Sequence, residues 1–423
     1  MNTGDVMYSW CENLFPLNRS LSGEGNKATL DYLKEVIPEL RVLELPTSEE
    51  YFDWTSPDEW IVRDAFIENM QGVRVIDWTN NNLHLVGYST PVDAIIDKES
   101  LLRKIHVHDA HEKAIPYRTS YYARDWGFCV STEQKNLIQE EKYRVVIDSQ
   151  LLKGKILSGE VVYPGTSGHE ILLSSYICHP SMANNELSGP VVLTALLLKI
   201  RQMKNRYYTY RVSFHPETIG AISYVQRYKL DGPSSIIAAW VFTCMGGPAD
   251  FSLMPSKYPN SLPERITIEA LKALNSRFKV EDFLQRGSDE RQFTSPHVEI
   301  PTVSLMRSMY GKYPEYHTSL DDLSFITPSS LESSLAVMTK VIEILETKPV
   351  YKARLACEPF LMKHQLEKGI SHEGTEITFR DILNVHMYCD GTNSIEDLAA
   401  LCKLTIGDVQ IICNSLLERK LIY

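Results

Sequence analysis

The chain has 423 residues, of which 43% are hydrophobic and 23% charged, a composition typical of a globular protein with two or three domains. Its formal net charge of −11 argues against a general nucleic-acid-binding protein, because affinity for phosphate rests on Lys and Arg. No apolar run is long enough to cross a membrane, and the N-terminal residues lack the pattern of a secretory signal. We therefore expect a cytoplasmic protein whose eight cysteines are reduced thiols.

The first 142 residues show two patterns. Residues 26–37 carry apolar side chains at helical spacing, and residues 41–46 predict a strand that Pro46 closes. Residues 48–142 are rich in aromatic side chains, and short β-like runs such as GVRVID and NNLHLVGYS lie between turn signals. We interpret this second stretch as a small β-rich domain inserted into a larger one.

From residue 143 onward, predicted strands and helices alternate. The predicted strands are KYRVVIDS, GEVVYPG, EILLSSYIC, YYTYRVSFHP, SIIAAWVFTCMGG and IPTVSLM, and the predicted helices are GPVVLTALLLKIRQM, ISYVQRYKL, RITIEALKALNSR and SSLESSLAVMTKVIEILETK. This alternation, with apolar β-branched strands, predicts an α/β fold whose mostly parallel central sheet carries helices on both faces. In such sheets, ligands bind beyond the carboxyl ends of the strands.

A last predicted unit begins at about residue 355. TFRDILNVHMYC, SIEDLAALCKL and GDVQIICNSLLERK are short amphipathic segments, and LIY follows as a strand stub, an order that resembles a winged helix. The predicted domains are therefore an α/β domain over residues 1–47 and 143–354, an inserted β-rich domain over 48–142, and a C-terminal winged-helix domain over 355–423.

The segment that runs from Ser175 to Gly189 places a histidine where a predicted strand ends. His179 precedes a polar loop that leads to Ser188 and a helix. A histidine in this position can bind a metal ion, since neutral imidazole is a common zinc ligand. Alternatively, its ring hydrogen-bonds to the backbone, as neutral histidines often do. The segment by itself leaves both interpretations open.

Three further polar loops adjoin predicted strands. In PETIG, Glu217 stands at a strand end before a helix, where it either caps the helix or acts as a general base. Asp289 belongs to the charged loop GSDERQF, where it is either a site residue or a solvated loop charge. His317 follows a strand and a turn. Because the carboxyl ends of parallel strands meet at one edge, we expect these loops to converge as in a hydrolytic metal site.

Taken together, these motifs resemble those of the zinc aminopeptidases of clan MH, which include di-zinc aminopeptidases and single-zinc glutaminyl cyclases. The motifs that carry the resemblance are NRSLSGEGNKATLDYL, FDWTSPDEW, NNLHLVGYS, CHPSMANNELSGP, PETIG, GSDERQF and PEYHTSLDDL. Within the clan, the chain looks like bacterial aminopeptidase-like proteins with an inserted β domain and a winged-helix tail, seen near polysaccharide-biosynthesis genes. The resemblance spans nearly the whole chain and implies the aminopeptidase (phosphorylase/hydrolase-like) fold.

The resemblance also implies roles for individual residues. His179 and His317 match the first and last zinc-binding histidines, and Glu217 matches the general base. The metal would polarise a carbonyl oxygen while Glu217 takes a proton from water and delivers it to the leaving amine. Arg291 or Tyr316 would anchor a substrate carboxylate or steady the oxyanion.

Some positions depart from the pattern of these relatives. Asn185 stands where they have a zinc-binding aspartate, and an amide is a poorer zinc ligand than a carboxylate. Glu186 beside it, Glu217 or Asp289 would then supply the missing carboxylate. Thr218 replaces a second ligating glutamate, and Cys244 falls near a further aspartate. The resemblance therefore implies at most one Zn²⁺ ion, with an empty site as the alternative.

Two functions of different classes follow. The first is a zinc-dependent aminopeptidase-like hydrolase of a small peptide or aminoacyl amide, in its narrower form with a carbohydrate-linked substrate. The second, motivated by Asn185, is a catalytically impaired binding or regulatory protein that keeps the peptidase fold. DNA binding through the C-terminal unit is disfavoured, because the segment GDVQIICNSLL contains no Lys or Arg. A homo-oligomer, with the insert as a contact, is compatible with the sequence.

Overall fold

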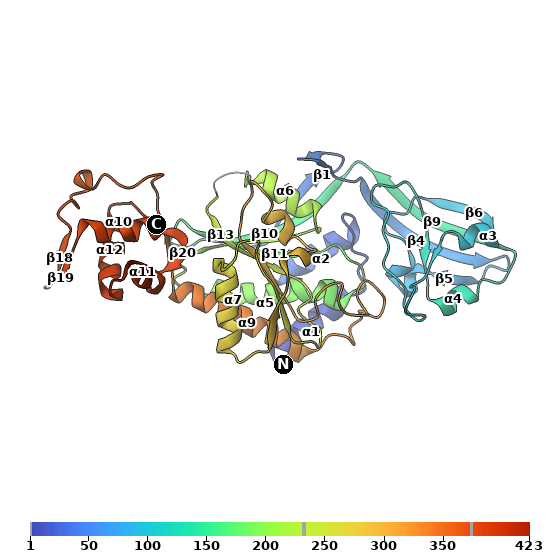
Figure 1. Ribbon diagram of the computed structural model, residues 1–423. Coiled ribbons are helices and arrows are strands. Elements are labelled where there is room, and N and C mark those ends of the chain that lie inside the picture. Colours follow the sequence, from blue (N-terminus) through green and yellow to red (C-terminus); the bar gives the residue numbers. More distant parts are fainter. Residues whose placement is uncertain (1, 231–233, 373–374) are drawn as a thin grey trace.

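The computed structural model describes residues 2–230, 234–372 and 375–423, and Figure 1 shows a large sheet with its helices between two smaller regions. In spatial order, the eight strands of this sheet are β1 (Arg41–Pro46), β10 (Lys155–Tyr163), β12 (Thr209–His215), β11 (Glu170–Tyr176), β13 (Ile236–Phe242), β16 (Thr302–Met306), β14 (Phe251–Met254) and β15 (Phe278–Val280). Strands β12, β11, β13 and β16 run parallel to one another, whereas β1, β10 and β14 add antiparallel pairings.

Alternation along the buried strands divides the apolar side chains between the two faces of the sheet. In β11, Ile171 and Leu173 pack into one core, whereas Leu172 between them packs into another. The first core includes α1 (Thr3–Leu14), α2 (Glu24–Val36), α5 (Ser188–Gln202), α7 (Leu262–Ala273) and α9 (Pro328–Thr347), and the second includes α6 (Ile219–Arg227) and α8 (Glu290–Phe293). The predicted α/β fold with helices on both faces is confirmed.

A separate antiparallel sheet lies beside the large one (Figure 1). Its four strands, in spatial order, are β5 (Arg74–Asp77), β4 (Glu59–Asn69), β9 (Lys142–Leu152) and β6 (Val92–Asp97). The strand predicted over KYRVVIDS forms as β9, but it pairs with β4 and β6 and does not join the large sheet. The expected boundary at residue 143 therefore cuts through this small sheet. An alternating apolar run predicts a strand without specifying its partner, which explains the difference.

The small sheet is docked onto the large one through a shared core. Ala65 and Ile147 of the small sheet belong to the same apolar cluster as Tyr176 and Ile219, which lie at the end of β11 and the start of α6. The connecting segments contribute β2 (Glu50–Tyr51), β3 (Trp54–Thr55), β7 (Ile105–His106), β8 (Phe128–Cys129), α3 (Lys98–Leu102) and α4 (Thr132–Asn136). The inserted segment thus lies against the strand ends where the candidate site was expected.

The C-terminal region contains the three predicted helices, α10 (Phe379–Tyr388), α11 (Ile395–Cys402) and α12 (Ile406–Glu418), around an apolar core of their own. Its strands are β17 (Val350–Lys352), β18 (Ile370–His372), β19 (Thr375–Ile377) and β20 (Asp390–Ser394). The strand expected at LIY is reduced to a bridge between Ala353 and Ile422. The winged-helix assignment stays a prediction.

Among the described residues no single helix is long and apolar enough to cross a membrane, and α11 with α12 reaches those limits only as a pair bent by 111°.

Candidate functional site

The loops that leave the parallel strands form a cleft at the carboxyl edge of the sheet. His179 follows β11, Glu217 follows β12, and His317 lies in the long loop between β16 and α9. These three side chains, with Arg291, line a cavity of about 320 Å³. The structure therefore brings together the two histidines and the glutamate that the strand-end motifs singled out.

His179 is held by a buried carboxylate on the side away from the cleft. Its Nδ1 lies 3.2 Å from Oε2 of Glu186, and its main-chain N–H donates to the same oxygen at 2.7 Å. Arg19, fully buried, donates to the other Glu186 oxygen at 2.8 Å. Burial disfavours a charged ring, but the hydrogen bond and charge of Glu186 prevail and raise the pKa of His179. This pairing fixes the ring so that Nε2 faces the cleft, as an outer carboxylate does for a metal-ligating histidine.

His317 approaches His179 from the opposite side of the site. The centroids of the two rings are 5.2 Å apart, and the His317 ring stacks on Tyr316 at 3.9 Å. Nε2 of His317 is buried and has no hydrogen-bond partner among the described residues. Burial and the neighbouring His179 hold the pKa of His317 well below its usual range, so the ring is neutral. A neutral imidazole with a free nitrogen has the form that binds a metal ion.

Glu217 completes the centre of the cleft. Its Oε2 lies 3.9 Å from Nε2 of His179, and its Oε1 accepts a 2.8 Å hydrogen bond from Ser288. Burial raises the pKa of Glu217 to about 7, against the attraction of His179. A carboxyl group that exchanges its proton near neutral pH suits a general base. The residue after it, Thr218, has a φ of 64°, so the chain turns abruptly between β12 and α6.

Asn185 is buried beside Tyr176, whose ring packs against His179, and protein groups orient its amide. Its Nδ2 donates to the Tyr176 hydroxyl at 2.8 Å and to Cys244 Sγ at 3.5 Å, whereas its Oδ1 is buried with no partner among the described residues. Its main-chain N–H donates at 2.9 Å to Asp321, which also accepts from the Asn184 N–H at 2.6 Å. Asp321 therefore anchors the Asn185 loop. The sequence motif YHTSLDDL contained this residue, but it was not singled out.

Asp289 and Glu186, the carboxylates considered as replacement ligands, are engaged elsewhere. Asp289 accepts the Thr218 N–H at 2.7 Å through Oδ1, and its Oδ2 lies 3.2 Å from Nε2 of His215. Glu186 is occupied by Arg19, by His179 and by main-chain N–H groups. Their assignment as metal ligands stays a prediction, and their contacts favour orienting roles.

Three residues that lie close enough together to bind a metal ion are instead hydrogen-bonded to one another and to their neighbours. Cys178, His179 and Glu186 bring such atoms within 4.8 Å of one another. However, burial holds the pKa of the Cys178 thiol well above its usual range, and its Sγ accepts the Glu217 N–H at 3.2 Å. A neutral thiol is a poor metal ligand, and so is a carboxylate whose oxygens already accept hydrogen bonds from protein groups.

The two residues expected to contact substrate lie in different places. Arg291 lines the cleft and donates to the Thr218 hydroxyl at 2.7 Å, so its charge lies at the cleft mouth. Tyr316 stacks on His317 and touches the site through that ring. Of the two, Arg291 has the position that a substrate group can reach.

The inserted segment supplies one wall of the cleft. Tyr117 packs against both His179 and His317, with ring centroids 5.2 and 5.1 Å away, and its N–H donates to the His317 carbonyl at 2.8 Å. Its hydroxyl is 3.0 Å from that of Tyr121, which also lines the cleft. The aromatic richness of residues 48–142 was a signal of this wall, but it did not identify these two residues.

Comparison with known proteins identifies the family of the chain. The family described as a domain of unknown function, DUF4910, matches residues 8–348. A protein of Clostridium acetobutylicum, named as a candidate polysaccharide biosynthesis protein with an aminopeptidase-like domain, is 36% identical over 403 residues, which cover 94% of this chain and 91% of that protein.

Solved structures agree with this assignment. The crystal structure of a candidate peptidase from Clostridium acetobutylicum superposes with a TM-score of 0.80 at 34% identity and covers 100% of this chain and 96% of its own. BSAP, a zinc aminopeptidase from Bacillus subtilis, has a TM-score of 0.56 at 10% identity, covering 80% of this chain and 94% of that one, a likeness that shows the fold alone. The chain belongs to the DUF4910 family and has the aminopeptidase-like fold.

Proposed function

We propose that this protein is a metal-dependent hydrolase that holds one Zn²⁺ ion between His179 and His317 and cleaves an amide bond of a small peptide or aminoacyl substrate. The observation that carries the proposal is the meeting of the two imidazoles. They come from loops 138 residues apart in the numbering, yet their ring centroids lie 5.2 Å apart beside Glu217. Two imidazoles beside a carboxylate, at the ligand-binding edge of an α/β sheet, are typical of a hydrolytic metal site.

The residues present fit a single ion. Nε2 of His317 and Oδ1 of Asn185 are buried without partners among the described residues. Leaving such a group unsatisfied costs about 1–3 kcal/mol, and a bound cation would remove that cost. The ion would be held by His179, His317 and the Asn185 amide oxygen. When bound, zinc polarises a substrate carbonyl and acidifies water.

The side chains of the cleft supply the remaining chemistry. Glu217, with its pKa raised by burial to about 7, takes a proton from the attacking water and delivers it to the leaving amine. Ser288 holds Oε1 of Glu217 and so directs Oε2 toward the cleft. Arg291 attracts a carboxylate of the substrate, and Tyr117 and Tyr121 exclude water from one wall.

The test compares metal content with hydrolysis. Wild-type protein is dialysed against zinc, assayed for bound metal, and incubated with aminoacyl p-nitroanilides. We expect about one zinc per chain, hydrolysis that a chelator abolishes, and a Glu217→Gln variant that keeps zinc but loses hydrolysis. His317→Ala should lose both. Protein that binds no zinc, or a zinc-loaded wild type that cleaves none of the aminoacyl amides, would contradict the proposal.

Asn185 favours a second candidate, a binding or regulatory protein with an impaired site. Because an amide oxygen binds zinc more weakly than a carboxylate, the wild type would turn over slowly or not at all. An Asn185→Asp variant should then gain hydrolysis that the wild type lacks. Equal activity in the two proteins would exclude impairment at this position.

The relative in polysaccharide biosynthesis suggests which amide is cleaved. Since that protein is 36% identical and carries an aminopeptidase-like domain, we propose a carbohydrate-linked substrate in this chain as well. The eight cysteines are all free, which suits the reducing cytoplasm as the location. We further propose the division of the chain into an α/β domain, an inserted domain and a winged-helix domain that contacts protein and not DNA.

A further inference from the structure

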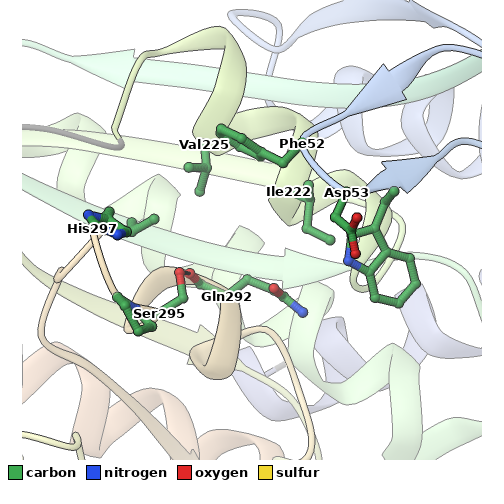
Figure 2. A pocket seen from close by; sticks show the side chains of 10 residues that line it. Phe52, Asp53, Ile222, Val225, Gln292, Ser295 and His297 are labelled. Atoms are coloured by element: carbon green, nitrogen blue, oxygen red, sulfur yellow. Dashed lines mark hydrogen bonds between the residues drawn. The ribbon is translucent and has the colours of Figure 1, made fainter.

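A second cavity, of about 450 Å³, lies beside the cleft and plays no part in the chemistry described above. Figure 2 shows Phe52, Asp53 and Ile222 on one side of it and Gln292, Ser295 and His297 on the other. One wall is the hairpin of β2 and β3, and the others are α6 and the chain around α8.

This pocket continues from the cleft along shared walls. Trp54 lines both cavities. On α6, Ile219 faces the cleft and Val225 faces the pocket, and a helix rises about 1.5 Å per residue, so the two positions are about 9 Å apart. On α8, Arg291 lines the cleft and its neighbour Gln292 lines the pocket. The two cavities therefore lie next to each other, with Trp54, α6 and α8 contributing to the walls of both.

The β2–β3 hairpin carries two exposed aromatic side chains and has a strained backbone at one of them. Tyr51 pairs with Trp54, so Phe52 and Asp53 form a two-residue turn, and Phe52 has a φ of 53°. Turns of this kind normally place Gly, Asn or Asp at that position, because a bulky residue there is strained. Phe52 is nevertheless 50% exposed and Trp54 42% exposed. Neither ring belongs to an apolar core cluster, and both line the pocket.

The pocket also has polar groups that can bind a ligand. Asp53, Gln292 and His297 contribute polar side chains to its lining. Lys and Arg are absent from the lining, which disfavours a phosphate or another anion beside Asp53. What remains is an apolar, partly aromatic floor with separate donors and acceptors at its rim.

We propose that this pocket binds a sugar ring of the substrate, next to the bond that the cleft cleaves. A pyranose has an apolar face of C–H groups, which suits Phe52 and Trp54, and hydroxyl groups at its edge, which suit Asp53, Gln292 and His297. Its role in catalysis rests on the proposed function, because a ring held here would anchor the part of the substrate that lies next to the cleft.

Direct binding of simple glycosides tests the assignment without turnover. Methyl glycosides of glucose, galactose and N-acetylglucosamine, with N-acetyl-leucine amide as the apolar comparison, are added to the full-length protein and followed by saturation-transfer NMR. At least one glycoside should bind. Phe52→Asn removes the ring and places a residue suited to positive φ, so it should lower the affinity at least tenfold while the melting temperature stays equal or rises. Gln292→Ala should weaken binding, and Phe360→Ala, at an exposed aromatic of the C-terminal region, should not.

The outcomes separate this inference from the proposed function. Glycoside binding that survives in Glu217→Gln and disappears in Phe52→Asn supports the sugar pocket even if no hydrolysis is found. Absence of binding by all three glycosides overturns it, even if zinc-dependent hydrolysis is present. Binding of the leucine amide alone, or glycoside binding that is unchanged in Phe52→Asn, overturns it as well.

Discussion

The two histidines of the candidate site have contrasting surroundings. On one side, His179 is tied through Nδ1 to Glu186, which Arg19 and two main-chain N–H groups hold in a buried network. On the other side, Nε2 of His317 and Oδ1 of Asn185 are buried without partners among the described residues. In the first half, around His179, protein groups hold the Glu186 carboxylate, although Nη2 of Arg19 is unpaired among the described residues. In the second half, around His317 and Asn185, the unpaired atoms are of the kind that binds a metal ion. Unpaired buried polar atoms destabilise the folded protein, so their position indicates where a ligand binds.

Removal of Arg19 should have the largest effect. An Arg19→Met variant leaves Glu186 buried without its counter-charge, so we expect the free energy of unfolding to fall by about 3–5 kcal/mol in urea denaturation. The double variant Arg19→Met/Glu186→Gln should recover part of the loss, because the neutral amide needs no counter-charge and its oxygen still accepts from the main-chain N–H groups. Lys27→Met, which breaks the exposed ion pair with Asp31, is the matched control and should cause no measurable change. A small effect of Arg19→Met would show that the first half is not a rigid unit.

The pH dependence of the free energy of unfolding should reveal the protonation of Glu217, which lines the cleft with His179 and His317. Because burial raises its pKa from 4.5 to about 7, the folded protein binds this proton more tightly than the unfolded chain does. Its contribution is therefore complete below pH ~4.5 and is lost as the pH rises through ~7. In metal-free protein, the wild type should lose on the order of 1–3 kcal/mol relative to Glu217→Gln across this window. Parallel pH profiles of the two proteins would refute the raised pKa.

Asn185→Asp should sharpen the contrast by converting a weak ligand into a strong one. We expect zinc affinity, measured by competition with a chromogenic chelator, to rise about tenfold or more. The metal-free variant should be less stable than the wild type, because it places a second buried carboxylate near Asp321. Unchanged affinity would mean that this side chain does not face the ion.

His317→Phe should have the smallest effect on the metal-free protein. The ring is kept and the unpaired Nε2 is removed, but Phe is strained at the φ of 56° found here, so the free energy of unfolding should change by no more than about 1 kcal/mol. Zinc should no longer raise the melting temperature of the variant, although it raises that of the wild type. A clear loss of stability would show that Nε2 is satisfied in the folded protein.

Much of the fold was predictable because burial imposes simple periods. The apolar runs around β11 and β13 and the helical spacing in α5 and α9 gave the α/β layers. Helix α1 was not predicted, although Met7, Cys11 and Leu14 recur at helical spacing, and neither were β14 and β15. The partner of β9 was missed, because pairing depends on the whole sheet and not on the strand.

For the site, the sequence by itself determined the polar residues at the ends of parallel strands, since an α/β sheet directs those loops to one edge. His179, Glu217 and His317 followed from that rule and from the motif resemblance. Only the tertiary structure decided which polar groups are already paired. Glu186 and Asp289 have protein partners, whereas Nε2 of His317 has none among the described residues, and the sequence spacing carries no record of such contacts. The aromatic wall of Tyr117 and Tyr121 and the pocket at Phe52 likewise depend on how the inserted segment packs against the strand ends.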